Sequence, residues 1–261
     1  MVEVMAKVLK HSIRLLLDKS QLGRRLLKAY GHYNLSRQAA SFGDAKAFFT
    51  HIYQTNLWGS AESASGPGST VGYTENLRRE LADLVRRLNI RRILDAPCGD
   101  FNWFRFVDLP PGTSYVGGDI VASLVACNQE RYGDDTRTFC VIDIRHDLLP
   151  PSDLWICRDV LFHLSNADIR NALENFGQSD ISYLLTSTHP TCRRNSDIPT
   201  GSYRDLNLEI EPFCFPPPVI RIDDWIDGFP VRQMGLWRRE DLIFAGVVRC
   251  GISHHRGEFD K

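Results

Sequence analysis

Three aspartates, Asp95, Asp119 and Asp143, each stand at the end of a short apolar run of the chain. In an open α/β sheet the carboxyl ends of the parallel strands meet at one edge, and nucleotides bind there. Gly99 follows the first run, and Asp119 stands 20 residues beyond it, the offset at which an acidic residue meets ribose hydroxyls. A carboxylate accepts both hydrogen bonds of a cis-diol, and Asp143 would accept one from an adenine amino group. The set predicts an adenosine site.

The turn after Asp95 does not have the residues of a dinucleotide-binding loop. Pro97 and Asp100 stand where the GxGxxG fingerprint would need glycine, and Asp100 would repel a phosphate at a helix N-terminus. A ligand with adenosine, no phosphate and a positive centre fits better, and S-adenosylmethionine is such a ligand. Its sulfonium suits the carboxylates and the faces of nearby aromatic residues such as Trp103 and Phe162.

Four segments resemble the motifs of the class I S-adenosylmethionine-dependent methyltransferases. The segment Asp-Ala-Pro-Cys-Gly-Asp at 95–100 is similar to the first motif, although the usual glycine-rich run keeps only Gly99. Residues 118–120, 142–144 and 155–164 are similar to the motifs of the second, third and fourth strands. The resemblance covers residues 74–250. It implies that the cofactor-binding residues are Asp95, Pro97, Cys98, Gly99, Asp119, Ile120, Asp143, Ile144, Cys157 and Arg158.

Within this resemblance, Asp95 and Gly99 would line the methionine end of the cofactor, and the backbone at Cys157 and Arg158 would meet its amino acid part. Asp119 would hold the ribose and Asp143 the adenine. Gly99 would let the backbone approach the ligand where a Cβ would collide.

The alternation of apolar runs with helical stretches predicts a Rossmann-like, three-layer α/β sandwich. Its seven-stranded, mostly parallel sheet would end in an antiparallel hairpin. The expected strands are 92–95, 114–119, 138–143, 153–159, 181–188, 231–237 and 242–248. The expected helices are 74–88, 120–131, 167–176 with Asn166 as N-cap, and a short one at 222–226.

Residues 1–72 are expected to form a helical cap and lid, and residues 73–261 the methyltransferase domain. Residues 2–30 have the pattern of a basic amphipathic helix, which would pack on the domain, form a homodimer or lie on a membrane. Asp44 is a plausible N-cap of a second helix. The lid segment (residues 57–70) is small and polar, and Trp58 favours a ligand-contacting lid over a plain linker.

Methyl transfer to a hydroxyl needs a general base, and the fold places the acceptor beyond the fourth and fifth strands. His163 stands four residues past Asp159, and His189 ends the fifth strand, so either histidine is a candidate base, and either could instead be structural. A metal site built from Asp159, His163 and His189 is disfavoured, and no metal is expected. The polar loop after His189 would either bind a sugar-like acceptor through Asn195, Asp197 and Arg204, together with Trp58, or be a solvated connector.

The composition narrows the function classes. A formal net charge of −1 gives no bulk attraction to nucleic acid, and no apolar run is long enough for stable membrane insertion. Seven cysteines without a CxxC pair favour a reducing, cytoplasmic environment. The predicted function is O-methylation of a small polar or carbohydrate-like molecule. The alternatives are methylation of a protein side chain and a non-catalytic S-adenosylmethionine-binding partner.

Overall fold

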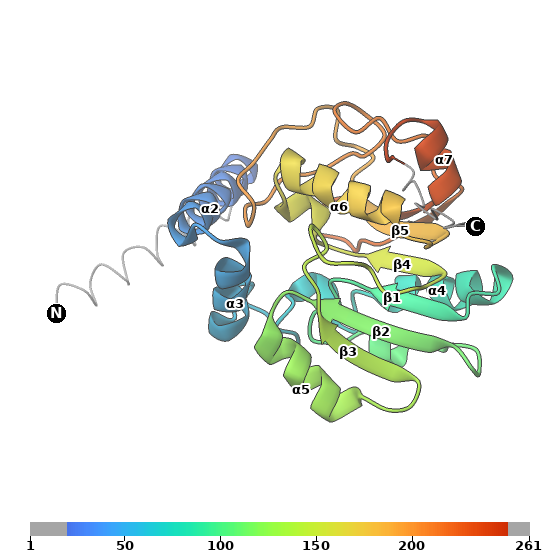
Figure 1. The fold of residues 1–261 in the computed structure, drawn as a ribbon. Helices are drawn as coiled ribbons and strands as arrows, with labels where there is room; N and C mark the ends of the chain where they lie inside the picture. Colours follow the sequence, from blue (N-terminus) through green and yellow to red (C-terminus); the bar gives the residue numbers. More distant parts are fainter. Residues whose placement is uncertain (1–19, 250–261) are drawn as a thin grey trace, which may run out of the picture.

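The computed structural model describes residues 20–249, and a seven-stranded sheet lies at its centre (Figure 1). The strand order is β3-β2-β1-β4-β5-β7-β6; the first five strands are parallel and β7 runs antiparallel to both neighbours. This confirms the predicted Rossmann-like sheet and its antiparallel hairpin. The strands are β1 Arg92–Asp95, β2 Ser114–Asp119, β3 Arg137–Val141, β4 Leu154–Cys157, β5 Tyr183–Thr188, β6 Ile220–Asp223 and β7 Gln233–Arg238.

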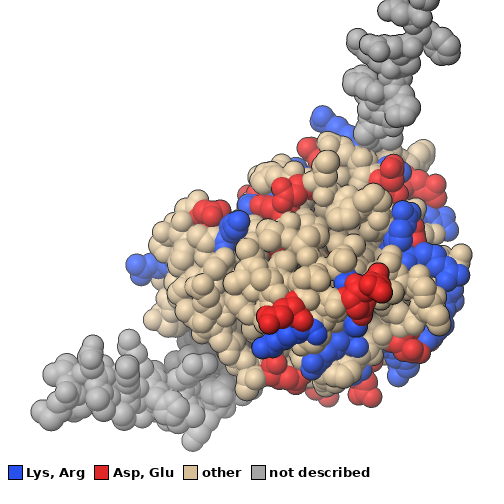
Figure 2. Space-filling view, turned by 60° about the horizontal axis from the view of Figure 1, so that its bottom comes forward, with Lys and Arg blue, Asp and Glu red and all other residues tan. Residues whose placement is uncertain are grey.

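Helices cover both faces of the sheet because successive side chains of each buried strand point to opposite sides. Ile93 packs with α4 (Glu75–Arg87) and α5 (Ala122–Tyr132), while its neighbour Leu94 packs with α6 (Asn166–Gln178). The predicted apolar stripe of α4 is confirmed, since the leucines of this helix and its Val85 are buried in the same hydrophobic core as Ile93. On the face drawn in Figure 2, basic side chains lie beside acidic ones around a broad uncharged region.

Two helices precede the sheet, α2 (Gln21–Phe42) and α3 (Ala45–Thr55), and they pack together through Ala39, Phe48 and Ile52. The predicted N-cap Asp44 is confirmed: its carboxylate accepts hydrogen bonds from the backbone N–H groups of the first turn of α3. Most of the predicted helix 2–30 lies outside the described residues. No helix between residues 20 and 249 is long and apolar enough to cross a membrane.

The tail differs from the prediction. The expected helix at 222–226 begins within β6, where Ile220 and Ile222 pack inward while Arg221 and Asp223 face solvent, the alternation of a half-buried strand. The expected strand 242–248 is wrong as well: α7 (Arg239–Phe244) occupies its start, with two acidic residues in the first turn, where the helix dipole favours them. The hairpin is therefore β6–β7. The side chain of Ser165, rather than Asn166, caps α6.

The segment between β5 and β6 is long and contains no helix or strand. Figure 1 shows it running over the α6 side of the sheet towards α2. Its Tyr203 ring lies 4.7 Å from the ring of His32 on α2, measured between centroids. This segment and the lid segment thus border the carboxyl-end edge of the sheet.

Candidate functional site

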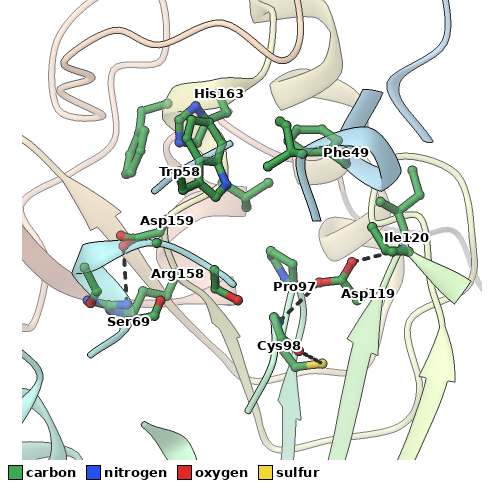
Figure 3. A pocket seen from close by; sticks show the side chains of 18 of the residues that line it. Phe49, Trp58, Ser69, Pro97, Cys98, Asp119, Ile120, Arg158, Asp159 and His163 are labelled. Atoms are coloured by element: carbon green, nitrogen blue, oxygen red, sulfur yellow. Dashed lines mark hydrogen bonds and ion pairs between the residues drawn. The ribbon is translucent and has the colours of Figure 1, made fainter. Parts of the chain in front are cut away.

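A cavity of about 340 Å³ opens at the carboxyl ends of β1, β2 and β4 (Figure 3). It brings together most of the residues that the sequence singled out, although they come from distant parts of the chain. Those that line it are Trp58, Asp95, Pro97, Cys98, Gly99, Asp119, Ile120, Asp143, Ile144, Arg158, Asp159, His163 and His189. Cys157 does not line it: this residue is buried in β4, where its carbonyl accepts a hydrogen bond from Thr186.

Asp119, at the end of β2, is held by the backbone. One of its carboxylate oxygens accepts from the N–H of Val121 at 3.0 Å and the other from the N–H of Gly99 at 3.2 Å. Burial raises the pKa of Asp119 to about 6, although these hydrogen bonds lower it. A carboxylate has about four lone-pair sites, so each oxygen keeps the capacity to accept one further hydrogen bond from a ligand in the cavity.

Asp95, at the end of β1, is 2% exposed and has one side-chain partner, the hydroxyl of Tyr115, which donates to it at 2.8 Å. Burial raises the pKa of Asp95 to about 7; the Tyr115 hydrogen bond and the nearby Arg158 oppose this rise without cancelling it. A cationic group placed in the cavity would stabilise the ionised carboxylate, so this position suits a positively charged ligand.

Asp143 follows β3 and is engaged by Arg145. The guanidinium donates to both of its carboxylate oxygens, at 2.8 and 2.7 Å. Burial alone would raise the pKa of Asp143, but the Arg145 hydrogen bonds outweigh it and lower the pKa. The backbone N–H of Arg145 also donates to the oxygen Oδ1, so the freer atom for a ligand amino group is Oδ2.

The lid segment is fastened to the first motif. Asp100 accepts hydrogen bonds from the Ser63 hydroxyl at 3.0 Å, the Ala64 N–H at 2.8 Å and the Ser65 hydroxyl at 3.2 Å. The side-chain amide of Asn102 donates to the Ser69 carbonyl and to the Glu62 carboxylate of the same segment. Asp100, expected only to repel phosphate, therefore holds the lid segment over the cavity, and residues 64–69 form part of the cavity wall.

The conformation and the surroundings of Gly99 both require glycine. Its φ is +56°, in the region that L side chains disfavour, and a Cβ there would lie 2.2 Å from the Ser65 hydroxyl oxygen. The absence of a side chain at this position lets the lid segment pack directly against the loop after β1.

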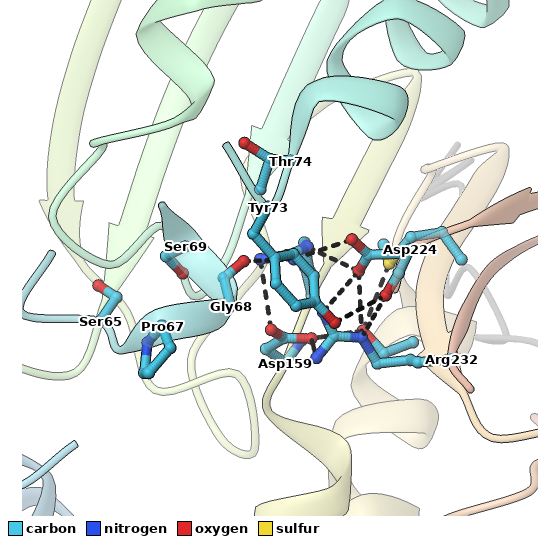
Figure 4. A network of polar contacts seen from close by, with 12 residues as sticks. Ser65, Pro67, Gly68, Ser69, Tyr73, Thr74, Asp159, Asp224 and Arg232 are labelled. Carbon is cyan, nitrogen blue, oxygen red and sulfur yellow. Dashed lines mark hydrogen bonds and ion pairs between the residues drawn. The ribbon is translucent and has the colours of Figure 1, made fainter. Parts of the chain in front are cut away.

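Two arginines and two aspartates form a largely buried network at the wall of the cavity (Figure 4). Arg158 donates to both carboxylate oxygens of Asp224, at 2.9 and 3.0 Å, and to the Gly68 carbonyl of the lid segment at 2.7 Å. Arg232 pairs with Asp224 and, at 2.9 Å, with Asp159. Burial would raise the pKa of Asp159, but the two arginines lower it, so Asp159 is an anion fixed between two cations.

The Nδ1 atoms of the two histidines have opposite hydrogen-bonding roles: that of His163 donates and that of His189 accepts. His163 Nδ1 lies 2.7 Å from the Ser202 carbonyl oxygen, which can only accept, so Nδ1 carries the proton and Nε2 the lone pair. His189 Nδ1 instead accepts from the Leu206 N–H at 3.1 Å, so its proton is on Nε2. Burial lowers the pKa of both residues, that of His163 to about 4, and keeps both rings neutral.

Three residues proposed to bind the acceptor do not line the cavity. Asn195 donates to the Asn207 and Glu211 carbonyls, and Arg204 donates to the Ser196 and Leu164 carbonyls, so both hold the loop together. Asp197 accepts from the N–H of Asn166 at the start of α6. From the same loop, Tyr203 does line the cavity. Within residues 20–249, no group of three His, Cys, Asp or Glu side chains is placed to hold a metal ion.

No protein-family model matches the sequence, and no curated protein has a significantly similar sequence. Solved structures do match. An S-adenosylmethionine-dependent methyltransferase from Leishmania major has a TM-score of 0.54 at 16% identity, covering 71% of this chain and 83% of that one. Magnesium protoporphyrin IX methyltransferase from Synechocystis PCC 6803, with S-adenosylhomocysteine bound, has a TM-score of 0.48 at 15% identity, covering 64% and 84%.

Strand order, the cavity at the carboxyl ends of the strands and the match to the Leishmania major structure agree with one another. The chain has the fold of the Rossmann-like, class I S-adenosylmethionine-dependent methyltransferases.

Proposed function

We propose that the protein is an S-adenosylmethionine-dependent methyltransferase that methylates a hydroxyl group of a small polar, sugar-like acceptor. The observation that carries the proposal is the pairing, in one cavity, of buried strand-end carboxylates with a neutral histidine whose Nε2 lone pair is available. In this proposal residues 20–72 act as a helical cap and lid over the methyltransferase domain.

The cavity fits the cofactor at each of its parts. The two unused lone-pair sites of Asp119 match the two hydroxyls of a ribose, and Asp143 Oδ2 is positioned to accept from an adenine amino group. Asp95 offers a buried anionic site for the positively charged methionine end. The cofactor, when bound, supplies a methyl group activated on a sulfonium, so the protein must position the acceptor and remove its proton.

His163 is the better candidate for the general base. Its ring is oriented by the Ser202 carbonyl, and the lone pair on Nε2 can take a hydroxyl proton. His189 offers an N–H at Nε2, so it can donate a hydrogen bond to an acceptor oxygen but is not set up to remove a proton. Asp159 is bound by Arg158 and Arg232, and its role is to balance their charge.

The acceptor end of the cavity supports a sugar-like ligand. Trp58, His163 and Tyr203 pack as a ring cluster there, with centroids 5.0 Å apart for Trp58 and His163 and 5.6 Å apart for His163 and Tyr203. Aromatic faces pack against the apolar faces of sugar rings, while His189 can meet a hydroxyl oxygen. Asn195, Asp197 and Arg204 shape the loop that carries Tyr203 instead of contacting the acceptor.

The test is transfer of a labelled methyl group from S-adenosylmethionine to glucose, galactose, mannose and rhamnose, and to a small-molecule extract. We expect methyl ether formation by the wild type and a loss of kcat of about 100-fold or more in His163→Ala, since general base catalysis contributes about that much. His189→Ala should mainly raise the KM for the acceptor. Full turnover by His163→Ala, with cofactor affinity unchanged, would contradict the assignment of the base.

A further inference from the structure

A second cavity, of about 290 Å³, adjoins the first on the side of the ring cluster. Helix α2 forms one wall of it, through residues 31–38, and Trp58 and Tyr203 form the other. Those two rings line both cavities, so they are the partition between them. We call the second cavity the α2 groove.

The α2 groove lies at the acceptor end of the site. His163 is in ring contact with both partition residues, Trp58 and Tyr203, and the ring of His32, which lines the groove, lies 4.7 Å from that of Tyr203 between centroids. Figure 3 shows Trp58 and His163 at one end of the main cavity, with Asp119 and Ile120 at the other. A molecule whose reacting hydroxyl meets His163 would therefore extend into the α2 groove on the side away from the aspartates that would bind the cofactor.

The lining of the α2 groove limits what it can bind. Its polar side chains are those of His32, Asn34 and Gln38, and among the described residues that line it there is no Lys, Arg, Asp or Glu. A phosphate or carboxylate would find no cationic partner there, and an ammonium no anionic one. Amide and imidazole groups beside two aromatic rings suit a neutral ring that carries several hydroxyls, because each hydroxyl both donates and accepts hydrogen bonds.

We propose that the α2 groove is a second sugar subsite, so that the acceptor is a neutral glycoside of at least two rings. One ring presents its hydroxyl to His163, and the next ring crosses the partition and lies between Trp58, Tyr203 and the amide side chains of Asn34 and Gln38. The inference rests on the proposed function, because it takes the main cavity to hold the acceptor.

The test uses the protein saturated with S-adenosylhomocysteine and saturation-transfer NMR with cellobiose, maltose and lactose, with glucose as the one-ring reference. We expect at least one disaccharide to receive saturation on both rings from the wild type. In the double variant Asn34→Ala, Gln38→Ala its dissociation constant should rise about tenfold, as for two lost hydrogen bonds, while that of glucose stays unchanged. Arg37→Ala, an exposed residue of α2 outside the groove lining, is the matched control and should behave as wild type.

Two results would overturn the inference: binding of none of the three disaccharides, or equal disaccharide affinity in the wild type and the double variant. Calorimetry with S-adenosylhomocysteine on the same samples separates this failure from that of the proposed function. If S-adenosylhomocysteine binds and the disaccharides do not, the subsite assignment fails and the methyltransferase assignment stands. If S-adenosylhomocysteine does not bind either, both fail.

Discussion

Asp100→Asn should loosen the lid segment and speed the release of the cofactor product. The carboxylate accepts three hydrogen bonds from Ser63, Ala64 and Ser65, and the asparagine side chain keeps its size while removing its charge. A hydrogen bond to a charged group contributes about 1.5–3 kcal/mol, against about 0.5–1.5 kcal/mol for a neutral one. At this half-buried site the substitution should weaken the attachment of the lid segment by about 2 kcal/mol in total. This free energy corresponds to a factor of roughly 30 in a rate or equilibrium constant.

The assay is stopped-flow tryptophan fluorescence, which would follow S-adenosylhomocysteine leaving a cavity that Trp58 and Trp103 line. We expect the dissociation rate constant to rise roughly 30-fold in Asp100→Asn. Asp108→Asn is the matched control, because Asp108 is an exposed carboxylate paired with Arg86 and does not line the cavity. An unchanged dissociation rate in Asp100→Asn would show that the lid segment does not restrain the ligand.

Four further predictions test charge and protonation. The affinity for S-adenosylmethionine, measured by calorimetry, should rise between about pH 5.5 and pH 8, because burial raises the pKa of Asp119 to about 6 and that of Asp95 to about 7. Once ionised, Asp119 can accept both ribose hydrogen bonds and Asp95 attracts the positively charged methionine end, so a pH-independent affinity would count against these assignments. Both carboxyl groups have folded-state pKa values above the usual value of about 3.9, so their protonated forms favour the folded protein. Their contribution to the free energy of unfolding is therefore fully present below about pH 4 and is lost as the pH rises to about 7, which urea unfolding would measure. Asp224→Ala should cost about 3–5 kcal/mol of unfolding free energy, because it leaves two buried arginines without their shared anion, whereas the exposed Asp227→Ala should change it by less than about 0.5 kcal/mol. Long-range ¹H–¹⁵N spectra should show the proton of His163 on Nδ1, and the same tautomer as in His189 would contradict the assigned base.

The parallel part of the fold was predictable because its signals are local. Each of the first five strands is an apolar run closed by a polar or turn residue, and the predicted ranges differ from the observed ones by at most two residues at either end. The three strand-end aspartates therefore fell at one edge of the sheet, as topology requires. The tail was less predictable because residues 222–226 include Asp223 and Asp224, and acidic residues also occur at helix starts. The pairing of β6 with β7 across nine intervening residues also leaves no short turn signal.

The contacts that complete the site were not predictable from the sequence. Asp100 meets Ser63 across 37 positions and Arg158 meets Asp224 across 66, and no local pattern marks such pairs. The tautomer of each histidine depends on which backbone group its Nδ1 faces, which only the folded chain determines. The hydrogen bonds of the loop after His189 were not predictable either: the side chains of Asn195 and Arg204 donate to nearby backbone carbonyls, and polarity alone cannot distinguish that from a binding surface.

Calorimetry of S-adenosylmethionine with the wild type and with Asp119→Ala tests most directly whether the cavity binds this cofactor. We expect the wild type to bind and the variant to bind about 100-fold more weakly, because two hydrogen bonds from a ribose to a buried carboxylate are lost. Nicotinamide dinucleotides should not bind either protein. Equal affinity in the two proteins, or binding of a nicotinamide dinucleotide without binding of S-adenosylmethionine, would contradict this assignment of the cofactor site.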